Sequence, residues 1–544
     1  MTLSGTFLIA APALPAIAAA VIALARPLGE QSSRWAVRAA CVAFAAALVV
    51  AVVVAVSGPV SAVVDGDGSA RFGLYASRVT ALLGLLTTGV GLVVQSFASR
   101  NLQGDLFGRR FFVLASLLTA ATTSVAFAAT LGLLCASWIV AGLALAALVT
   151  HRATWQPARR SSRRTLRSLW IGDGALLAAT FLVVVSVGEI DLRTPADAAR
   201  ELADASTLGG NLLPVVAVLL TIAGISRSAL VPVHQWLPST IAAPTPVSAL
   251  LHAGVVNGAG MLLVRLAPVF GSSTVATHMA FAAGAVTACY ATTVMLVRSD
   301  VKGNLAWSTA GQMGFMTVQV AIGALPAALV HIVGHGMYKA ALFLGAGGSV
   351  TAHHRHHQRP APYGVTGGVR LGVALVVPAV ALWAAYRVFH PHLSTAAGVL
   401  VTAFAWGTAV RAVDGWLRSA PFRPLPAVAT AAFGATAGMF AYIGGLTAVE
   451  TFIEHAVPGE VAEPVSAALL VAILVAIALV VSVVWFTPGE RMGKVRARVY
   501  AFALTSAPVA SELTTRGSST GVAPVPETRH LRPDLELARS TRSR

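Results

Sequence analysis

The sequence predicts an all-α polytopic membrane protein with about 14–15 transmembrane helices. Of its 544 residues, 56% are hydrophobic and only 11% are charged, whereas soluble domains carry about 25% charged residues. Runs of about 20 apolar residues, each long enough to cross a bilayer, recur along most of the chain. We expect helices in these runs because a segment in lipid has to satisfy its own backbone hydrogen bonds.

The apolar runs define the expected helices in order. No basic segment precedes the first run, and further spans follow it, so we expect a membrane helix there and not a cleaved signal peptide. The boundary at Thr130 is the least marked. The expected spans lie near residues 6–26, 36–57, 76–97, 111–130, 131–150, 169–188, 211–232, 246–268, 276–297, 304–324, 326–348, 370–388, 395–412, 425–447 and 464–486.

These spans divide the chain into four parts. We expect N-terminal membrane helices over 1–110, a conduction core over 111–350 and C-terminal membrane helices over 351–487. From about residue 488 the composition changes to Arg, Ser, Thr and Pro. This composition predicts a basic, largely disordered cytoplasmic tail over 488–544.

Loop charges predict the orientation. Arginines gather in alternate loops, and the loop 151–168 alone holds six; Arg26, Arg34 and Arg38, then Arg100, Arg109 and Arg110, flank earlier turns. The intervening loops carry acids instead, such as Asp65, Asp67, Asp197 and Glu201. Because positive loops stay in the cytoplasm, we expect the N-terminus outside and the C-terminus inside the cell membrane. The net charge of +17 therefore reflects topology and contact with anionic lipid, and we expect no nucleic-acid partner.

Several classes of function are disfavoured. Cys41, Cys135 and Cys289 lie in separate apolar runs, so we expect packing roles and no iron–sulfur or zinc site. Nucleotide-binding fingerprints and nucleophile motifs are missing. We therefore expect neither a cofactor nor catalytic chemistry in this chain. A metal site is conceivable among the histidines of 353–357, but adjacent histidines in a short basic loop do not all face one ion, which favours a solvated loop.

The stretch between Arg227 and Pro246 predicts a broken membrane helix. It contains Pro232, Pro238 and Pro244 as well, and each proline inside a membrane helix removes a backbone donor. Such breaks occur where water and ions reach the middle of a membrane protein. His252 follows the break, where a satisfied core histidine is the alternative to a functional one.

A row of three ionisable residues lies further along the chain: His331, His335 and Lys339. Their four-residue spacing places all three on one stripe of one helix. Ionisable groups at membrane depth are costly, and their default interpretation is a proton or ion path. The alternative is a helix-packing stripe whose lysine extends to the interface. Lys302 alone is typical of a cytoplasmic helix end, and Asp173, a lone carboxylate at the start of a span, fits a structural pair with Arg167 or a neighbour.

Residues 170–350 resemble the proton-conducting antiporter-like subunits of respiratory complex I and of multisubunit Na⁺/H⁺ antiporters. The resemblance is carried by Trp170–Asp173, Arg227–Pro232, Trp236–Pro238, Ala243–His252, Asp300–Lys302, Ser308 to Phe315 and His331-x3-His335-x3-Lys339. It implies inverted repeats around a hydrated half-channel. In that picture His252, Lys302, His331, His335, Lys339, Arg227 and Asp173 line the ion path.

The chain departs from this pattern at two positions. The family has a Trp-Glu pair in the fifth span, but Ile139 follows Trp138 here, so the acidic half of a Lys–Glu pair is missing. Arg227 stands where the family has a lysine, and arginine does not release its proton in proteins. One of the two conduction sites of the family is therefore not expected to conduct.

The resemblance is strongest to the DabB-type membrane subunit of DAB inorganic carbon pumps, through Ala243–Gly260 and His331–Ala340. It implies a large soluble, zinc-containing, carbonic-anhydrase-like partner (DabA-type), and a cation gradient, expected to be of protons, that drives CO₂ hydration to bicarbonate. The alternatives are a proton-translocating subunit of a quinone oxidoreductase or Na⁺/H⁺ antiporter, and a non-conducting anchor. The histidine and lysine stripe disfavours the anchor.

Overall fold

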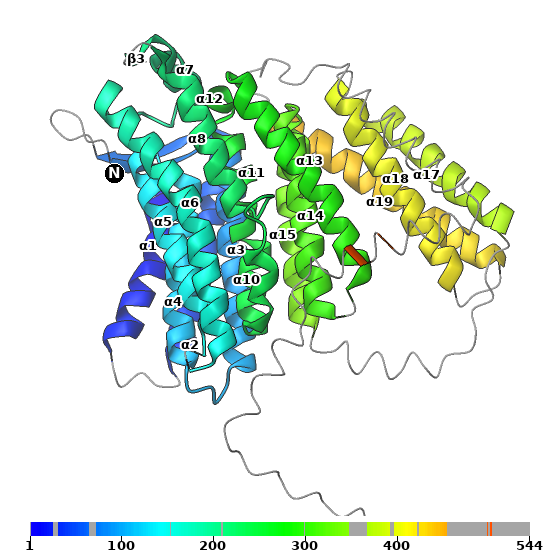
Figure 1. Cartoon of the computed structure of the whole chain (residues 1–544), viewed down its shortest axis with the longest axis horizontal. Helices are drawn as coiled ribbons and strands as arrows, with labels where there is room; N and C mark the ends of the chain where they lie inside the picture. Colours follow the sequence, from blue (N-terminus) through cyan, green and yellow to red (C-terminus); the bar gives the residue numbers. More distant parts are fainter. Residues whose placement is uncertain are drawn as a thin grey trace, which may run out of the picture.

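The computed structural model describes residues 2–453 except 26–30, 65–71, 153, 208–209, 299, 347–366, 392–395 and 421–423, and in addition residues 498, 501 and 502. The described chain is mainly helical, and most of its helices stand side by side (Figure 1). Eleven helices of this part are long and apolar enough to cross a bilayer. The predicted all-α polytopic membrane fold is confirmed.

The first five helices form where the apolar runs predict them. They are α1 (Leu3–Leu24), α2 (Gln31–Ser57), α3 (Arg78–Asn101), α4 (Gly108–Phe127) and α5 (Leu131–Val149). Side-chain caps set their starts: Ser77 and Thr80 form a capping box before α3, and the Thr130 hydroxyl accepts from Leu133 N at the start of α5. The weakly marked boundary at Thr130 is therefore a real helix start.

A β-hairpin lies between α2 and α3, where only a loop was expected. Its strands β1 (Val60–Val64) and β2 (Phe72–Ala76) pair antiparallel. Gly73 is needed there because a Cβ would come within 2.7 Å of Val63 Cα. The Gly73 carbonyl also accepts from Ala129 N, so the hairpin is tied to the turn between α4 and α5.

Helix α6 (Gln156–Val187) begins much earlier than predicted. Residues 156–168, expected to be a loop, are helical because one face of this extension packs on the bundle. Ser161 Oγ donates to Ser239 O at 2.8 Å, and Ser162 Oγ donates to Ala146 O at 2.9 Å. At 32 residues α6 is about 48 Å long, longer than the roughly 30 Å hydrocarbon core.

The predicted helix break is confirmed, and a second break follows it. After α7 (Pro195–Asp204) and the short hairpin of β3 (Ser206–Thr207) and β4 (Gly210–Asn211), α8 (Leu212–Arg227) stops inside the bundle. Only α9 (Trp236–Ser239) and η2 (Thr240–Ala242) intervene before α10 (Thr245–Ala253). The expected span near 246–268 corresponds to the apolar segment Thr245–Arg265, in which η3 (Val255–Asn257) separates α10 from α11 (Gly258–Arg265); α12 (Ala267–Gly271) follows.

Three long helices complete the main body, and three more form a neighbouring group. The first set is α13 (Thr274–Val297), α14 (Val301–Ala321) and α15 (Leu325–Gly345); the second, in yellow to orange in Figure 1, is α17 (Gly367–Phe389), α18 (Ala396–Ser419) and α19 (Pro424–Ile453). Arg78 Nη1 donates to Phe452 O at 3.0 Å, which ties the end of α19 to the start of α3. The histidines of 353–357, the expected span 464–486 and nearly all of the expected tail lie outside the described residues.

Candidate functional site: two buried charged centres beside a broken helix

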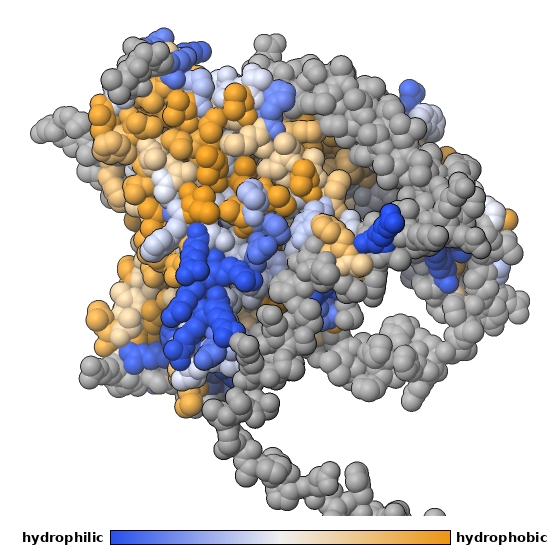
Figure 2. All heavy atoms as spheres, viewed as in Figure 1, coloured by the Kyte–Doolittle hydropathy of each residue, from blue (hydrophilic) through white to orange (hydrophobic). Residues whose placement is uncertain are grey.

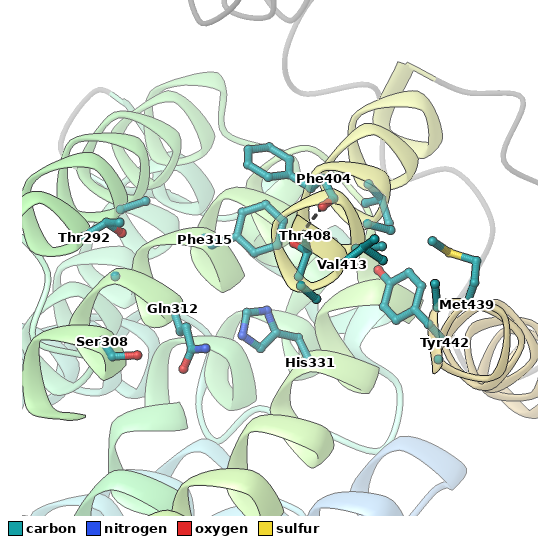
Figure 3. Close-up of a pocket in the computed structure, with 18 of the residues that line it drawn as sticks. Thr292, Ser308, Gln312, Phe315, His331, Phe404, Thr408, Val413, Met439 and Tyr442 are labelled. Atoms are coloured by element: carbon teal, nitrogen blue, oxygen red, sulfur yellow. Dashed lines mark hydrogen bonds between the residues drawn. The ribbon is translucent and has the colours of Figure 1, made fainter. Parts of the chain in front are cut away.

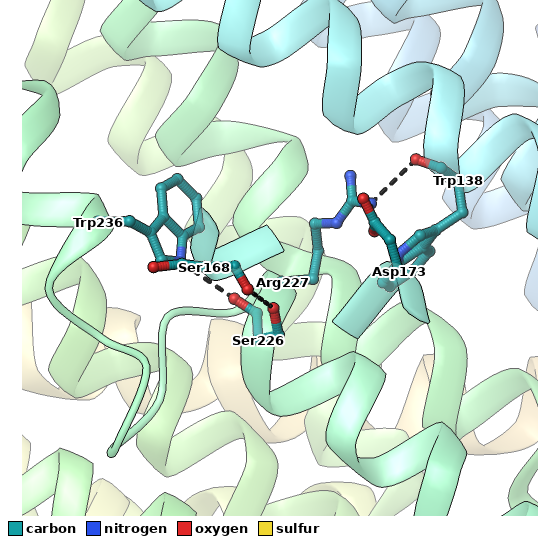
Figure 4. A network of polar contacts seen from close by, with 6 residues as sticks. All are labelled: Trp138, Ser168, Asp173, Ser226, Arg227 and Trp236. Atoms are coloured by element: carbon teal, nitrogen blue, oxygen red, sulfur yellow. Dashed lines mark hydrogen bonds and ion pairs between the residues drawn. The ribbon is translucent and has the colours of Figure 1, made fainter. Parts of the chain in front are cut away.

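The last residue of α8, Arg227, forms a buried ion pair with Asp173 of α6 (Figure 4). Its Nη2 lies 2.8 Å from Asp173 Oδ1 and also donates to Trp138 O of α5 at 2.9 Å. The guanidinium stacks over the Trp138 ring, with Cζ 4.4 Å from the centroid. Only 3% of the Arg227 side chain is exposed, so a desolvated charge is held by a carboxylate, a carbonyl and an aromatic face.

This geometry corrects two expectations about the centre. Asp173 pairs with Arg227 and not with Arg167, and the centre does contain an acidic partner, which α6 supplies in place of α5. The pair was missed because Asp173 and Arg227 are 54 residues apart. Because a guanidinium keeps its proton, the pair provides a fixed charge and not a group that hands protons on.

At the two helix breaks, side chains form hydrogen bonds with main-chain groups that have lost their helical partners. Trp236 Nε1 donates to Ser226 O at 3.0 Å, at the open end of α8 (Figure 4). Ser228 Oγ joins both breaks, since it donates to Val256 O and accepts from Ala259 N. Lys302, half-buried in α14, donates from Nζ to Ala243 O at 3.0 Å. Lys302 therefore stabilises the segment before α10 and is not part of the α15 stripe.

The predicted stripe of His331, His335 and Lys339 lies on α15 and faces the bundle. Lys339 is 0% exposed, and its Nζ donates to Ser308 Oγ of α14 at 2.9 Å. The alternative of a lysine that extends to the interface is therefore wrong. A buried ammonium held by a neutral hydroxyl is a group that can exchange its proton at membrane depth.

The histidines extend this centre along α15. His331 and His335 have ring centroids 5.9 Å apart, and His331 Nδ1 lies 2.9 Å from Gln319 Oε1 of α14. Among the described residues, neither ring nitrogen of the buried His335 has a hydrogen-bond partner. Buried polar groups are normally paired, so these nitrogens are free for transient protons or water.

His252 on α10 borders the same helix. Its ring stacks on Phe343 of α15 with centroids 4.3 Å apart, one turn beyond Lys339. Within the described part of the chain its Nδ1 is buried without a partner. The interpretation of His252 as a fully satisfied core histidine is therefore not supported.

A cavity of about 1270 Å³ opens on one end of the stripe. It lies between α13 and α14 on one side and α18 and α19 on the other, and its lining includes His331, Ser308 and Gln312. Figure 3 shows the His331 ring and the Gln312 side chain directed toward the same space. The cavity thus reaches His331 directly and Lys339 through its partner Ser308, whereas His335 and Lys339 are themselves buried. Most of the other lining side chains are apolar, so these few polar groups are the places where water could be held.

Gln319, the hydrogen-bond partner of His331, was not among the residues expected at the site. Helices α14 and α15 form a hairpin around residues 322–324. Gln319 lies two residues before the end of α14, whereas His331 lies six residues after the start of α15, so their distances from the turn did not indicate the pair.

The described residues contain no group of three or more His, Cys, Asp or Glu side chains that fits a metal ion. All three cysteines are free; Cys135 is buried, whereas Cys41 and Cys289 are exposed on the bundle surface. The expected packing role is therefore seen in the protein interior for Cys135, whereas Cys41 and Cys289 lie on exposed faces of their apolar helices, which in a membrane protein also face lipid.

Comparison with known proteins agrees with this architecture. Residues 128–365 match the family described as NADH:quinone oxidoreductase/Mrp antiporter, TM. The chain is 33% identical to a probable inorganic carbon transporter subunit DabB1 of Halothiobacillus neapolitanus over 53% of the chain, which spans only 51% of that protein. It is 29% identical to a probable inorganic carbon transporter subunit DabB of Bacillus subtilis, over 70% of the chain and 71% of that protein.

The fold is similar to that of a solved membrane complex. The Mrp complex of Dietzia sp. DQ12-45-1b contains a chain that superposes with a TM-score of 0.56 at 21% identity, over 95% of the present chain and 64% of the other. At that identity the likeness concerns the fold. The helices described above are those of a multi-span membrane protein, and its residues 128–365 match the NADH:quinone oxidoreductase/Mrp antiporter transmembrane family.

Proposed function

We propose that this chain is the membrane subunit of an energy-coupled inorganic carbon pump, which conducts cations, with protons as the expected ion. A soluble partner with zinc-dependent, carbonic-anhydrase-like chemistry hydrates CO₂ to bicarbonate at the cytoplasmic face. The observation that carries the conduction role is the buried row of His331, His335 and Lys339, joined to α14 by Ser308 and Gln319 and open to a cavity at His331.

The proposed path uses the α15 centre and not the α8 centre. Lysine and histidine exchange protons readily when their surroundings shift, whereas the Arg227–Asp173 pair holds a fixed charge. The carbon assignment is supported by the similarity to the two DabB subunits. In the proposed orientation the arginine-rich end of α6 faces the cytoplasm of the cell, and the N-terminus lies outside.

The second candidate is ion translocation within a quinone oxidoreductase or a Na⁺/H⁺ antiporter. It is favoured by the matched family, whose description includes both classes, and by the similarity in fold to a chain of an Mrp complex. The guanidinium at position 227 disfavours it, because the family resemblance places an exchangeable lysine there.

The test is rescue of a bacterial strain that lacks carbonic anhydrase. The full chain is expressed with the proposed partner, a soluble zinc-containing, carbonic-anhydrase-like protein of the DabA type from the same genome, and growth is measured in air and in air enriched with CO₂. We expect growth in air that requires both proteins. Absence of rescue, combined with restored growth of an antiporter-deficient strain at high sodium, would establish the second candidate instead.

A further inference from the structure

We propose that the exposed arginine face at the start of α6 is the docking surface for an acidic face of the soluble partner subunit. This face, called the α6 arginine face below, consists of Arg159, Arg160, Arg163, Arg164 and Arg167, all of which are exposed. The inference rests on the proposed function only in requiring a soluble partner, and it is independent of the reaction that the partner catalyses.

The five arginines form one continuous surface. At about 100° per residue they fall within an arc of about 140° on the helix, and Figure 2 shows hydrophilic atoms gathered over the lower part of α6. Residues 151–172 include no Asp or Glu. Arg159 and Arg160 contact only the neutral acceptors Thr154 O and Gln156 Oε1, at 3.5 and 3.4 Å. Within the described part of the chain, no carboxylate forms an ion pair with any of the five.

The distance of these arginines from the membrane surface favours a protein over a lipid as their binding partner. Trp170, three residues beyond Arg167 on α6, is 65% exposed, and exposed tryptophans of membrane helices sit at the headgroup level. With a rise of about 1.5 Å per residue, Arg167 stands about 4.5 Å and Arg160 about 15 Å beyond Trp170. A headgroup layer is only about 5–8 Å thick on each side. Lipid phosphates therefore reach Arg167 but not Arg159 or Arg160.

Two arginines of α2 provide the contrasting case. Arg34 and Arg38 are also exposed, and they flank Trp35, which is 47% exposed. Both arginines lie near the start of α2. Four helices, α2 to α5, cross the bundle between the start of α2 and the start of α6, so these two starts lie on the same side of the bundle. Arg34 and Arg38 thus lie at the headgroup level, where anionic lipid satisfies them.

The opposite side of the α6 extension is fixed to the broken segment. Ser161 Oγ donates to Ser239 O at the end of α9, and Ala243, four residues later, accepts from Lys302. A partner bound to the α6 arginine face therefore lies one helix away from the segment that connects the two helix breaks. This position couples docking to the broken helices through direct contacts.

The experiment compares two double variants of the full chain, Arg159→Gln/Arg160→Gln and the matched control Arg34→Gln/Arg38→Gln. Each removes two exposed arginines from the same membrane side. The chain is reconstituted in phosphatidylcholine nanodiscs, and its Kd for the proposed DabA-type soluble protein from the same genome is measured at low and high salt. Phosphatidylglycerol retained during purification is counted by native mass spectrometry.

We expect Arg159→Gln/Arg160→Gln to weaken partner binding roughly three- to tenfold, to reduce its salt dependence and to leave bound phosphatidylglycerol unchanged. The α2 variant should do the reverse. Unchanged partner affinity in the α6 variant overturns the inference, as does loss of phosphatidylglycerol without loss of partner. If the unsubstituted chain does not bind the soluble protein, the proposed function itself fails at its partner.

Discussion

Lys339 and Arg227 are both buried at the centre of the bundle, but only the lysine can exchange its proton there. Lys339 is held by a neutral hydroxyl, Ser308 Oγ, whereas Arg227 is held by a carboxylate. The first arrangement leaves the charge of the side chain free to vary, and the second fixes it. The two centres are therefore expected to respond differently to substitution.

Replacing Lys339 by Ala should abolish ion-coupled activity with little loss of folded protein. A positioned proton-transfer group contributes about a hundredfold or more to a rate, so growth rescue in air and proton uptake into proteoliposomes should both fall by that order. Lys339→Arg is the matched control for charge, because it keeps the cation but does not release a proton. Retained activity in either variant would remove Lys339 from the path.

Replacing Asp173 by Asn should instead destabilise the protein. It leaves the Arg227 guanidinium without its countercharge, and breaking a buried ion pair on one side costs about 3–5 kcal/mol. The double variant Asp173→Asn/Arg227→Met removes both charges and should recover much of the loss in Tm. If the single variant is as stable as the unsubstituted chain, the pair does not hold α6 against α8.

Among the elements, the second helix break depends on glycine at position 258. A Cβ there would lie 2.4 Å from Arg227 Cγ and 3.0 Å from the Trp138 ring. Gly258→Ala should therefore cost about 1–3 kcal/mol through overpacking and displace the guanidinium. Gly334→Ala on α15 is the control, because nothing lies within 4 Å of its added Cβ, and helix propensity predicts about 0.5–1 kcal/mol of stabilisation. Tm values that do not separate the two variants would argue against close packing at the break.

The turn after α5 predicts a pH-dependent stability. His151 is buried beside Phe107 and Phe111, with Nε2 3.3 Å from Asp105 Oδ1. Burial lowers the pKa of His151 below its ordinary value of 6.5, and the nearby Asp105 only partly opposes this effect. The unfolded chain thus binds the proton more readily than the folded one.

The contribution of His151 is therefore present above about pH 6.5 and is lost as the pH falls below that value. The Tm of the purified chain should decrease between pH 7 and pH 5.5, and His151→Gln should make this decrease shallower. An identical decrease in the variant would assign the pH dependence to other groups.

For the whole molecule, the apolar runs predicted every span that falls within the described residues, because lipid leaves the backbone few alternatives to a helix. Four-residue spacing likewise predicted the stripe on α15, since spacing along one helix is a local property. Contacts between distant segments were not predictable in this way. The pairing of Asp173 with Arg227 depends on the register of α6 against α8, and the interruption after Ala253 depends on Gly258, whose neighbours Arg227 and Trp138 come from other helices.

The orientation of the whole molecule is open to a direct test. In a cysteine-free background, Arg163→Cys and Asp197→Cys place single thiols at opposite ends of the bundle, on α6 and α7 (Figure 1). A membrane-impermeant maleimide should label the Asp197→Cys variant in intact cells and the Arg163→Cys variant only after lysis. The reverse pattern would invert the topology inferred from the loop charges.

In the proposed pump the α15 centre carries the ion, and each charge that it takes across 100 mV of membrane potential supplies about 2.3 kcal/mol. That energy corresponds to about a fiftyfold concentration ratio. If the pump is driven as proposed, depolarising the membrane should therefore lower the bicarbonate gradient that the cell maintains.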